Sequence, residues 1–245
     1  MAIVRFNKVT KTYPLYHHFT GALKGVLFNL PSTMKVMKQG FTALQDLSFE
    51  IQEGEAVAFV GRNGAGKSTL LGLVAGVLRP TSGTVEVTKR VSPLLELGGG
   101  FHPELSGLEN IQLNGVLMGL SRKQVAAKTE EIIAFSGLGD FIHEPIRSYS
   151  SGMNARLGFS VVAHLEPELL LIDEVLAVGD AAFQRKCMDK MKEFRSQGVS
   201  VILVSHSAHD IELLCSRVIW IENHKIQADG PTAEVLPKYT QAMLG

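Results

Sequence analysis

The segment Gly61–Thr69 (GRNGAGKST) constrains the fold more than any other part of the chain. It matches the phosphate-loop pattern G-x-x-x-x-G-K-[ST] in full. The apolar run 55–60 before it predicts a buried strand, and the spacing of apolar residues over 70–78 predicts a helix after it. An ordinary turn is the alternative, and the correctly placed strand and helix count against it. The segment therefore predicts a nucleoside triphosphate site in an α/β core.

The residue types in this loop suit phosphate chemistry. Glycines let successive backbone N–H groups turn toward phosphate oxygens, and the helix N-terminus adds its dipole. Lys67 can reach the β- and γ-phosphates, and the hydroxyl of Ser68 is placed for Mg²⁺. The candidate nucleotide-binding residues of the loop are Gly61, Arg62, Asn63, Gly64, Ala65, Gly66, Lys67, Ser68 and Thr69.

Composition is that of a globular chain. Its 245 residues are 45% hydrophobic and 20% charged, enough for one domain with a sizeable core. No run of about 18 uncharged apolar residues is present, and the N-terminus lacks the apolar core of a signal peptide. Cys187 and Cys215 lack C-x-x-C spacing, so we expect reduced, buried thiols in a cytoplasmic protein rather than a metal site or a disulfide.

The net charge of zero conceals an asymmetry. Residues 1–45 hold six of the 24 basic residues and no acidic one, so the remainder has 18 basic against 24 acidic residues. A basic pole can face anionic lipid headgroups, a phosphorylated substrate or a nucleotide, or it can be a solvated face. The six residues are Arg5, Lys8, Lys11, Lys24, Lys35 and Lys38.

Residues 15–41 look like an insert between predicted strands at 3–9 and 42–51. Apolar residues within it recur at the spacing of one helix face until Pro31 ends the pattern. This helix either packs on its own domain or is presented to a membrane partner. The apolar positions are Phe19, Ala22, Leu23, Val26, Leu27 and Leu30.

The rest of the chain alternates between strand and helix patterns. Strands are predicted at 83–87 and 91–97, and continuous apolar runs at 169–172 and 199–204 predict strands buried on both faces, with a helix over 181–195 between them. Capping boxes at Ser106–Glu109 and Ser121–Gln124 open helices within 98–165, which we expect to form an inserted helical lobe. A helix is also predicted over 232–244.

Three polar sites complete the chemistry. Asp173 ends the predicted strand 169–172, where it can hold Mg²⁺, and Glu174 can orient or deprotonate the water that attacks the γ-phosphate. His206 follows the strand 199–204, where an imidazole can contact the γ-phosphate and that water. Tyr149–Met153 precedes a helical pattern over 154–165, and its small residues expose N–H groups as an anion site: Ser150, Ser151, Gly152 and Met153.

These motifs resemble the nucleotide-binding subunit of ATP-binding cassette (ABC) transporters over nearly the whole chain. Residues 61–68 match its Walker A motif, 169–173 its Walker B motif and 177–180 its D-loop. Residues 149–153 stand where the family has its LSGGQ signature. The resemblance implies that Glu174 is the catalytic glutamate, that His206 is the switch histidine, and that Tyr13 stacks on adenine.

The resemblance also implies architecture and partners. We expect a single ABC ATPase domain with a P-loop NTPase core (about 1–97 and 166–245), the helical lobe (about 98–165) and an antiparallel β subdomain. Two copies would form a head-to-tail homodimer that holds ATP and Mg²⁺ between one copy's phosphate loop and the other copy's signature. Met153 departs from the usual glutamine and Ser151 from the first glycine. The Q-loop position falls on Leu97, with Glu96 as its candidate substitute.

Three segments, 95–110, 149–153 and 173–180, look like the bacterial polysaccharide exporters for O-antigen, capsule and teichoic acid. This resemblance implies a separate membrane-spanning permease, a lipid-linked polysaccharide cargo (O-antigen above all), and a peripheral place on the cytoplasmic face of the bacterial inner membrane. The insert, with Lys24, Lys35 and Lys38, would then lie near the membrane and the lipid-pyrophosphate end of the cargo.

Two other functions stay open. One is a soluble cassette ATPase that acts on ribosomes or nucleic acid, although such proteins usually hold two cassettes and the neutral charge argues against nucleic acid. The other is an exporter of a small molecule, against which residues 95–110 argue. Some O-antigen exporters carry a C-terminal carbohydrate-binding β-sandwich. Because the sequence ends at Gly245, we expect that recognition of the glycan end occurs elsewhere or that the chain is truncated.

Overall fold

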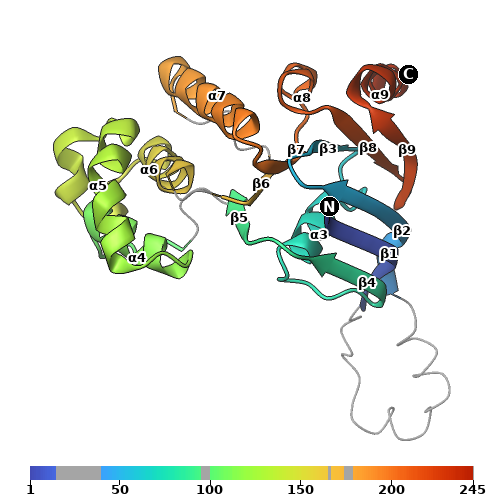
Figure 1. Ribbon diagram of the computed structural model, residues 1–245, viewed down its shortest axis with the longest axis horizontal. Helices are drawn as coiled ribbons and strands as arrows, with labels where there is room; N and C mark the ends of the chain where they lie inside the picture. The colour runs from blue at the N-terminus through green and yellow to red at the C-terminus, as the bar shows by residue number, and fades with distance from the viewer. Residues whose placement is uncertain (15–39, 95–99, 165–166, 174–178, 245) are drawn as a thin grey trace, which may run out of the picture.

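The computed structural model describes residues 1–14, 40–94, 100–164, 167–173 and 179–244. In this part of the chain the central element is a six-stranded sheet (Figure 1). Its first five strands run parallel and the last is antiparallel, which agrees with the predicted α/β class. The order is β5 (Val91–Leu94), β6 (Leu169–Asp173), β7 (Ser200–Val204), β3 (Ala56–Val60), β8 (Arg217–Glu222) and β9 (Lys225–Pro231).

The central strands are buried on both faces. In β3, Ala58 and Val60 point into one apolar cluster, whereas Val57 and Phe59 point into another. The runs 169–172 and 199–204 divide between the same two clusters, as expected for continuous apolar strands in a parallel sheet. Both faces therefore need a cover of helices or of a second sheet.

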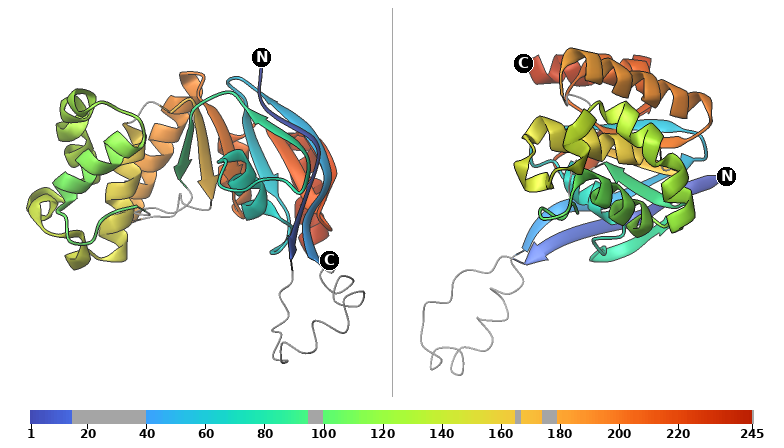
Figure 2. Two further views of the ribbon diagram at one scale, coloured as in Figure 1. Left: turned by 90° about the horizontal axis from the view of Figure 1, so that it is seen from below. Right: turned by 90° about the vertical axis from the view of Figure 1, so that its left-hand side faces the viewer.

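A second, antiparallel sheet provides one cover, with the order β2 (Gly40–Gln52), β1 (Ala2–Pro14) and β4 (Ser82–Val87) (Figure 2). β1 is longer than the predicted strand 3–9. It passes through a left-handed residue, Lys8 (φ 49°), and continues until Tyr13 pairs with Phe41. Because β2 begins at Gly40, the last two residues of the predicted insert 15–41 are strand. The predicted helix within 15–39 lies outside the described residues.

Helices complete the layers (Figure 1). α3 (Lys67–Val74) packs between the two sheets, and α7 (Ala181–Ser196), α8 (Ala208–Leu214) and α9 (Thr232–Leu244) cover the other face. α3 begins and ends earlier than the predicted 70–78. Gly66 caps its start and the left-handed Gly76 (φ 72°) follows its end. Cys187 and Cys215 are free and buried, as predicted.

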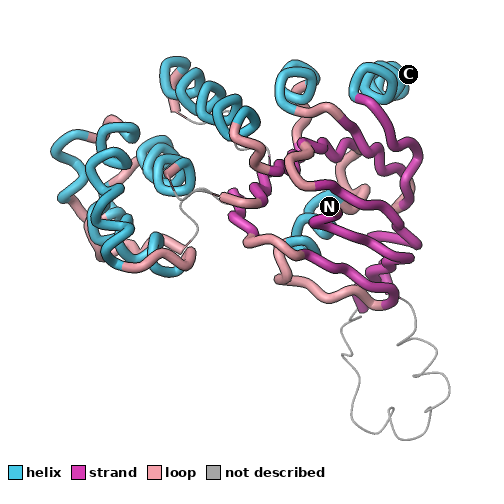
Figure 3. The backbone as a smooth tube through the Cα atoms, viewed as in Figure 1, coloured by secondary structure: helices cyan, strands magenta, loops and turns pink. Residues whose placement is uncertain are grey.

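The helical lobe projects from one side of the sheets (Figures 1 and 3). It holds α4 (Gly107–Leu117), α5 (Arg122–Ser136), the 3-10 turns η1 (Gly139–His143) and η2 (Ile146–Ser148), and α6 (Ser151–Ala163) around a core of their own. Both predicted capping boxes are present, at Ser106 and at Ser121. None of the helices in the described ranges is long and apolar enough to cross a membrane.

Candidate nucleotide-binding site

A pocket of about 470 Å³ opens where β6 and β7 end beside the phosphate loop. Ligand sites of parallel α/β sheets occur at these carboxyl ends because the loops that follow the strands converge there. Eight predicted site residues line the pocket together: Asn63, Gly64, Gly66, Lys67, Ser68, Thr69, Asp173 and His206. They come from three separate stretches of chain that the fold brings together at one pocket.

The phosphate loop is closed around the ammonium group of Lys67. Its Nζ donates to the carbonyl oxygen of Gly61 at 2.7 Å and to that of Arg62 at 3.2 Å, and only 8% of the residue is exposed. Ala65 is buried within the same turn, and Arg62 lies 3.9 Å from a carboxylate oxygen of Glu222. The loop therefore presents a cation and the start of α3 to one small volume, which suits a polyphosphate.

Gly66 is required by close packing. Its φ is 107°, and a Cβ atom there would collide with the carbonyl oxygen of Ala43 and with the Leu44 side chain. β2 therefore runs directly against the phosphate loop. Any residue with a side chain at position 66 would push the strand and the loop apart.

Ser68 and Asp173 face the same pocket from different elements. A hydroxyl and one carboxylate are oxygen donors of the kind that Mg²⁺ takes when phosphates and water supply its other ligands. In the described ranges, no group of three or more His, Cys, Asp or Glu side chains could hold a metal by itself. The residues present therefore fit a metal that arrives with the nucleotide.

Tyr13 lies beside the loop rather than in it. Its hydroxyl is 3.3 Å from Thr69 Oγ1, and the ammonium group of Lys11 lies 5.1 Å from its ring centroid. These two contacts fix the ring at the edge of the pocket next to the start of α3. An aromatic face at this place can meet a nucleobase whose phosphates occupy the loop.

Sequence reasoning missed three pocket residues, Phe41, Ala43 and Val204. Phe41 fell at the end of the predicted insert, and Ala43 and Val204 were read only as strand residues. The alternation of apolar residues in 41–51 was a usable signal, since it put Phe41 and Ala43 on one strand face. No local sequence pattern indicated that this strand face meets the phosphate loop.

The predicted signature residues lie elsewhere. α6 begins at Ser151, three residues before the predicted start at Asn154, because Ser150 caps it by accepting a hydrogen bond from the Met153 N–H at 3.2 Å. None of the residues that line the pocket belongs to this segment. A Cβ atom at Gly152 would meet only Ser150 Oγ, at 3.8 Å, so packing within the chain does not demand glycine there.

Glu174, Ala177, Glu96 and Leu97 lie outside the described residues. Asp180, the last residue of the predicted D-loop, caps α7 by accepting from the N–H groups of Phe183 at 2.8 Å and Ala182 at 3.0 Å.

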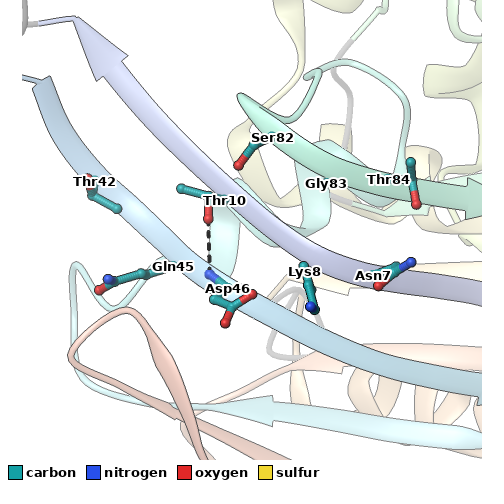
Figure 4. Close-up of a pocket in the computed structure, with 9 residues that line it drawn as sticks. All are labelled: Asn7, Lys8, Thr10, Thr42, Gln45, Asp46, Ser82, Gly83 and Thr84. Atoms are coloured by element: carbon teal, nitrogen blue, oxygen red, sulfur yellow. Dashed lines mark hydrogen bonds between the residues drawn. The ribbon is translucent and has the colours of Figure 1, made fainter.

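A larger hollow of about 680 Å³ lies on the antiparallel sheet (Figure 4). Thr42 lines it, whereas the neighbouring Phe41 and Ala43 line the nucleotide pocket, because successive strand residues face opposite sides. Thr10 Oγ1 there accepts from the Asp46 N–H at 3.1 Å. None of the predicted site residues that the structure describes lines this hollow, so its larger volume does not mark it as the nucleotide site.

Comparison with known proteins agrees with this geometry. The family model described as ABC transporter matches residues 44–177. The O-antigen export system ATP-binding protein RfbB of Klebsiella pneumoniae is 54% identical over 98% of both chains. The teichoic acids export ATP-binding protein TagH of Listeria monocytogenes is 41% identical over 97% of this chain and 70% of its own length.

A solved structure shares the fold. It is a dimeric ATP-binding cassette in a post-hydrolysis state bound to ADP and Pi, with a TM-score of 0.74 and 20% identity over 94% of this chain and 98% of that one. The phosphate loop, the strand carboxylate and the strand histidine meet in one pocket of this fold. The chain therefore belongs to the ABC transporter family, as one of its ATP-hydrolysing subunits.

Proposed function

We propose that this chain is the ATPase of an exporter that moves a lipid-linked polysaccharide, O-antigen above all, across the bacterial inner membrane. The main support for this choice of cargo is the 54% identity to an O-antigen export protein over 98% of both chains. A teichoic acid exporter at 41% identity supports the same chemical class, a polymeric envelope glycan. Neither relative's name points to ribosomes, nucleic acid or a small-molecule cargo.

Hydrolysis is assigned to the residues around the phosphate loop. Lys67 and the loop N–H groups bind the phosphates, and Tyr13 meets the adenine. Ser68 and Asp173 would hold Mg²⁺, which supplies charge neutralisation to the transferred phosphoryl group. Glu174 orients and deprotonates the attacking water, and His206, which lines the pocket, contacts the γ-phosphate.

A second copy of the chain completes the site. The nucleotide pocket of one copy contains no residue of its own signature segment. Ser151 is exposed, and the first N–H groups of α6 point from the start of that helix. We assign Ser150, Ser151, Gly152 and Met153 to the γ-phosphate of ATP bound on the partner subunit, so that ATP draws two copies together and its hydrolysis releases them.

A separate permease carries the cargo through the membrane. The cassette would lie at the cytoplasmic face as a peripheral subunit, built as one domain with its helical lobe at about 98–165. The insert at 15–41 and the basic N-terminal residues would lie toward the lipid headgroups and the lipid-pyrophosphate end of the cargo.

The test is rescue of glycan export. In an O-antigen-producing strain that lacks its own export ATPase but keeps the matching permease, the wild-type chain should restore surface O-antigen, detected on lipopolysaccharide gels. Glu174→Gln, expressed to the same level, should not. The wild-type chain should also co-purify with the permease from membranes. Co-purification with ribosomes, and no rescue with a matched permease, would contradict the proposal.

The role of the insert needs its own experiment. Reversing the charges of Lys24, Lys35 and Lys38 to Glu should lower export and leave basal ATP hydrolysis of the purified chain unchanged. The matched control reverses the charges of three exposed lysines that lie outside the insert: Lys192, Lys225 and Lys238. Equal export by the two triple variants would contradict a role of the insert in contact with the cargo or the membrane.

A further inference from the structure

Two aromatic residues lie together at one end of the nucleotide pocket: Phe41 lines the pocket, and Tyr13 contacts Thr69 at its edge. Tyr13 and Phe41 are register partners of the antiparallel pair β1–β2, so their side chains share one sheet face. Phe41 and Ala43 line the nucleotide pocket from that face. Phe41 is 46% exposed, which leaves ring surface available to a ligand.

The ring of Phe41 is held in place from another part of the fold. The imidazole of His224 packs edge-on against it, with ring centroids 5.4 Å apart and an interplanar angle of 89°. His224 lies in the turn between β8 and β9, which Glu222 and Lys225 close as partners. The contact therefore joins the β8–β9 hairpin to the strand that carries Phe41.

Two hydrogen bonds lock this contact. The ring nitrogen Nδ1 of His224 lies 3.1 Å from the carbonyl oxygen of Ala43, to which it donates. The backbone N–H of Gln45 donates to the carbonyl oxygen of His224 at 2.8 Å. One side-chain hydrogen bond to Ala43 and one backbone hydrogen bond from Gln45 thus hold the turn against β2.

The backbone of this turn is unusual for the residues that occupy it. Asn223 and His224 have φ values of 47° and 66°, as both central residues of a two-residue type I′ turn require. Asparagine tolerates this region, but glycine is the usual second residue because a side chain is strained there. A histidine kept in a strained position points to a use for its imidazole.

The carbonyl oxygen that His224 holds also abuts the phosphate loop. A Cβ atom at Gly66 would collide with this same oxygen of Ala43. The peptide at Ala43 is therefore fixed between the phosphate loop and the hairpin. As a result, the distance from the Phe41 ring to the phosphate positions is set before any nucleotide binds.

We propose that Phe41 is a second aromatic wall of the nucleobase subsite, beside Tyr13, and that His224 is its positioning residue. The inference rests on ATP binding at the phosphate loop and adds the residues that grip the base. Stacking does not read the edge of a base, so the two rings should hold adenine and guanine nucleotides alike.

The direct test measures binding to the full-length chain by titration calorimetry, with ATP, GTP and inorganic tripolyphosphate as probes. Phe41→Ala should weaken ATP and GTP binding by roughly 5- to 100-fold, the range of one base–aromatic stack, and leave tripolyphosphate binding unchanged. Phe41→Trp should keep nucleotide affinity. The matched control is Phe141→Ala in the helical lobe, where a similarly exposed ring (56%) is removed without any effect on the three probes.

His224→Gly separates positioning from stability. Glycine relieves the left-handed backbone but removes the hydrogen bond to Ala43, so the two effects oppose each other and the melting temperature should change little, while ATP binding weakens several-fold because Phe41 loses its support. In a Phe41→Ala background the same change should have no further effect on ATP binding. A purely structural histidine would lower the melting temperature and leave the affinity of the folded protein unchanged.

Three outcomes would overturn the inference: wild-type ATP affinity in Phe41→Ala, an equal loss of ATP and tripolyphosphate binding, or a loss confined to ATP and absent for GTP. Phe41→Leu, which keeps apolar bulk without a ring, should lose nucleotide affinity even if Phe41→Ala folds poorly. Failure of the wild-type chain to bind ATP would instead contradict the nucleotide site itself. In a chain that binds ATP, Lys67→Ala should weaken ATP and tripolyphosphate binding together, which distinguishes the phosphate subsite from the base subsite.

Discussion

The ammonium group of Lys67 donates a 2.7 Å hydrogen bond to the carbonyl oxygen of Gly61, at the opposite end of the phosphate loop. This hydrogen bond joins the two ends of the phosphate loop around the ammonium group of Lys67. A triphosphate that enters meets a positive charge already in position, at the start of a helix whose first N–H groups have no carbonyl partner within the helix. Phosphate binding then needs little reorganisation of the loop, which favours affinity.

Lys67→Ala should therefore weaken ATP binding itself. The loss of one charge-assisted interaction with phosphate corresponds to about 1.5–3 kcal/mol, or roughly 10- to 150-fold in the dissociation constant. Calorimetric titration with ATP measures it, and Lys192→Ala on α7, an exposed lysine remote from the pocket, serves as the control. ATP binding of Lys67→Ala within twofold of wild type would contradict the role.

Glu174→Gln should leave ATP affinity intact and lower turnover by roughly 10²- to 10⁴-fold, the contribution of a general base. Phosphate release measures turnover, and calorimetry measures binding. A glutamine keeps the size of the side chain and removes only its proton-accepting charge. Normal hydrolysis by this variant would take the base role away from Glu174.

The same Glu174→Gln variant should accumulate as a dimer in saturating ATP, because the shared nucleotide cannot be cleaved. Light scattering after gel filtration, with and without ATP, reads the mass. Ser151→Glu, which places a carboxylate at the start of α6 against the γ-phosphate, should stay a single copy under the same conditions. If Glu174→Gln showed the mass of a monomer in saturating ATP, that result would contradict a site shared between two subunits.

Arg217 should matter for stability far more than the exposed Arg5. The guanidinium of Arg217 donates to both carboxylate oxygens of Asp229, at 2.6 and 2.7 Å, and to a carboxylate oxygen of Glu55 at 3.0 Å. These bonds raise its pKa and tie β9 to β8 and to the segment before β3. Arg217→Ala should lower the free energy of unfolding by about 1–3 kcal/mol, since it leaves two partly buried carboxylates without their partner.

Arg5→Ala is the control for that measurement. Arg5 pairs with Glu50 and Glu86 at the surface, where all three side chains are about half exposed and water competes for the charges. Chemical denaturation of both variants gives the comparison. Equal destabilisation by the two substitutions would contradict the difference in their surroundings.

Asp180, which caps the start of α7, should make the stability of the folded protein depend on pH. The N–H group of Phe183, and secondarily that of Ala182, donate to its carboxylate and lower its pKa. A carboxyl whose pKa is lower in the folded state stabilises the protein above its ordinary value near 4, and this contribution disappears as the pH falls through the folded value. Asp180→Asn keeps a capping oxygen but cannot titrate.

The expected result is that wild type melts above Asp180→Asn at pH 6, and that the gap closes as the pH is lowered toward 3. Thermal melts at half-unit steps of pH measure it. A gap that stays constant from pH 6 to pH 3 would contradict a charged cap.

The sequence by itself determined the local chemistry of this protein. The phosphate loop, the strand that ends in Asp173 and the two capping boxes are contiguous patterns, and their structures follow from glycine geometry, apolar periodicity and reciprocal capping bonds. The meeting of His206 with the loop followed from the rule that parallel strands present their carboxyl ends to one edge, whereas the order of the six strands came only from the folded chain. The local patterns need no knowledge of which distant segments touch.

Tertiary structure decided the parts that depend on pairing between distant strands. Phe41 became a pocket residue because β1 continues past Lys8 and pairs Tyr13 with it, and His224 became its support because the β8–β9 turn packs on β2. The start of α6 at Ser151 depended on one side-chain cap. Register and turn packing are set by long-range contacts whose energies no local pattern encodes, and for that reason Phe41 and His224, unlike Tyr13, were identified only in the folded chain.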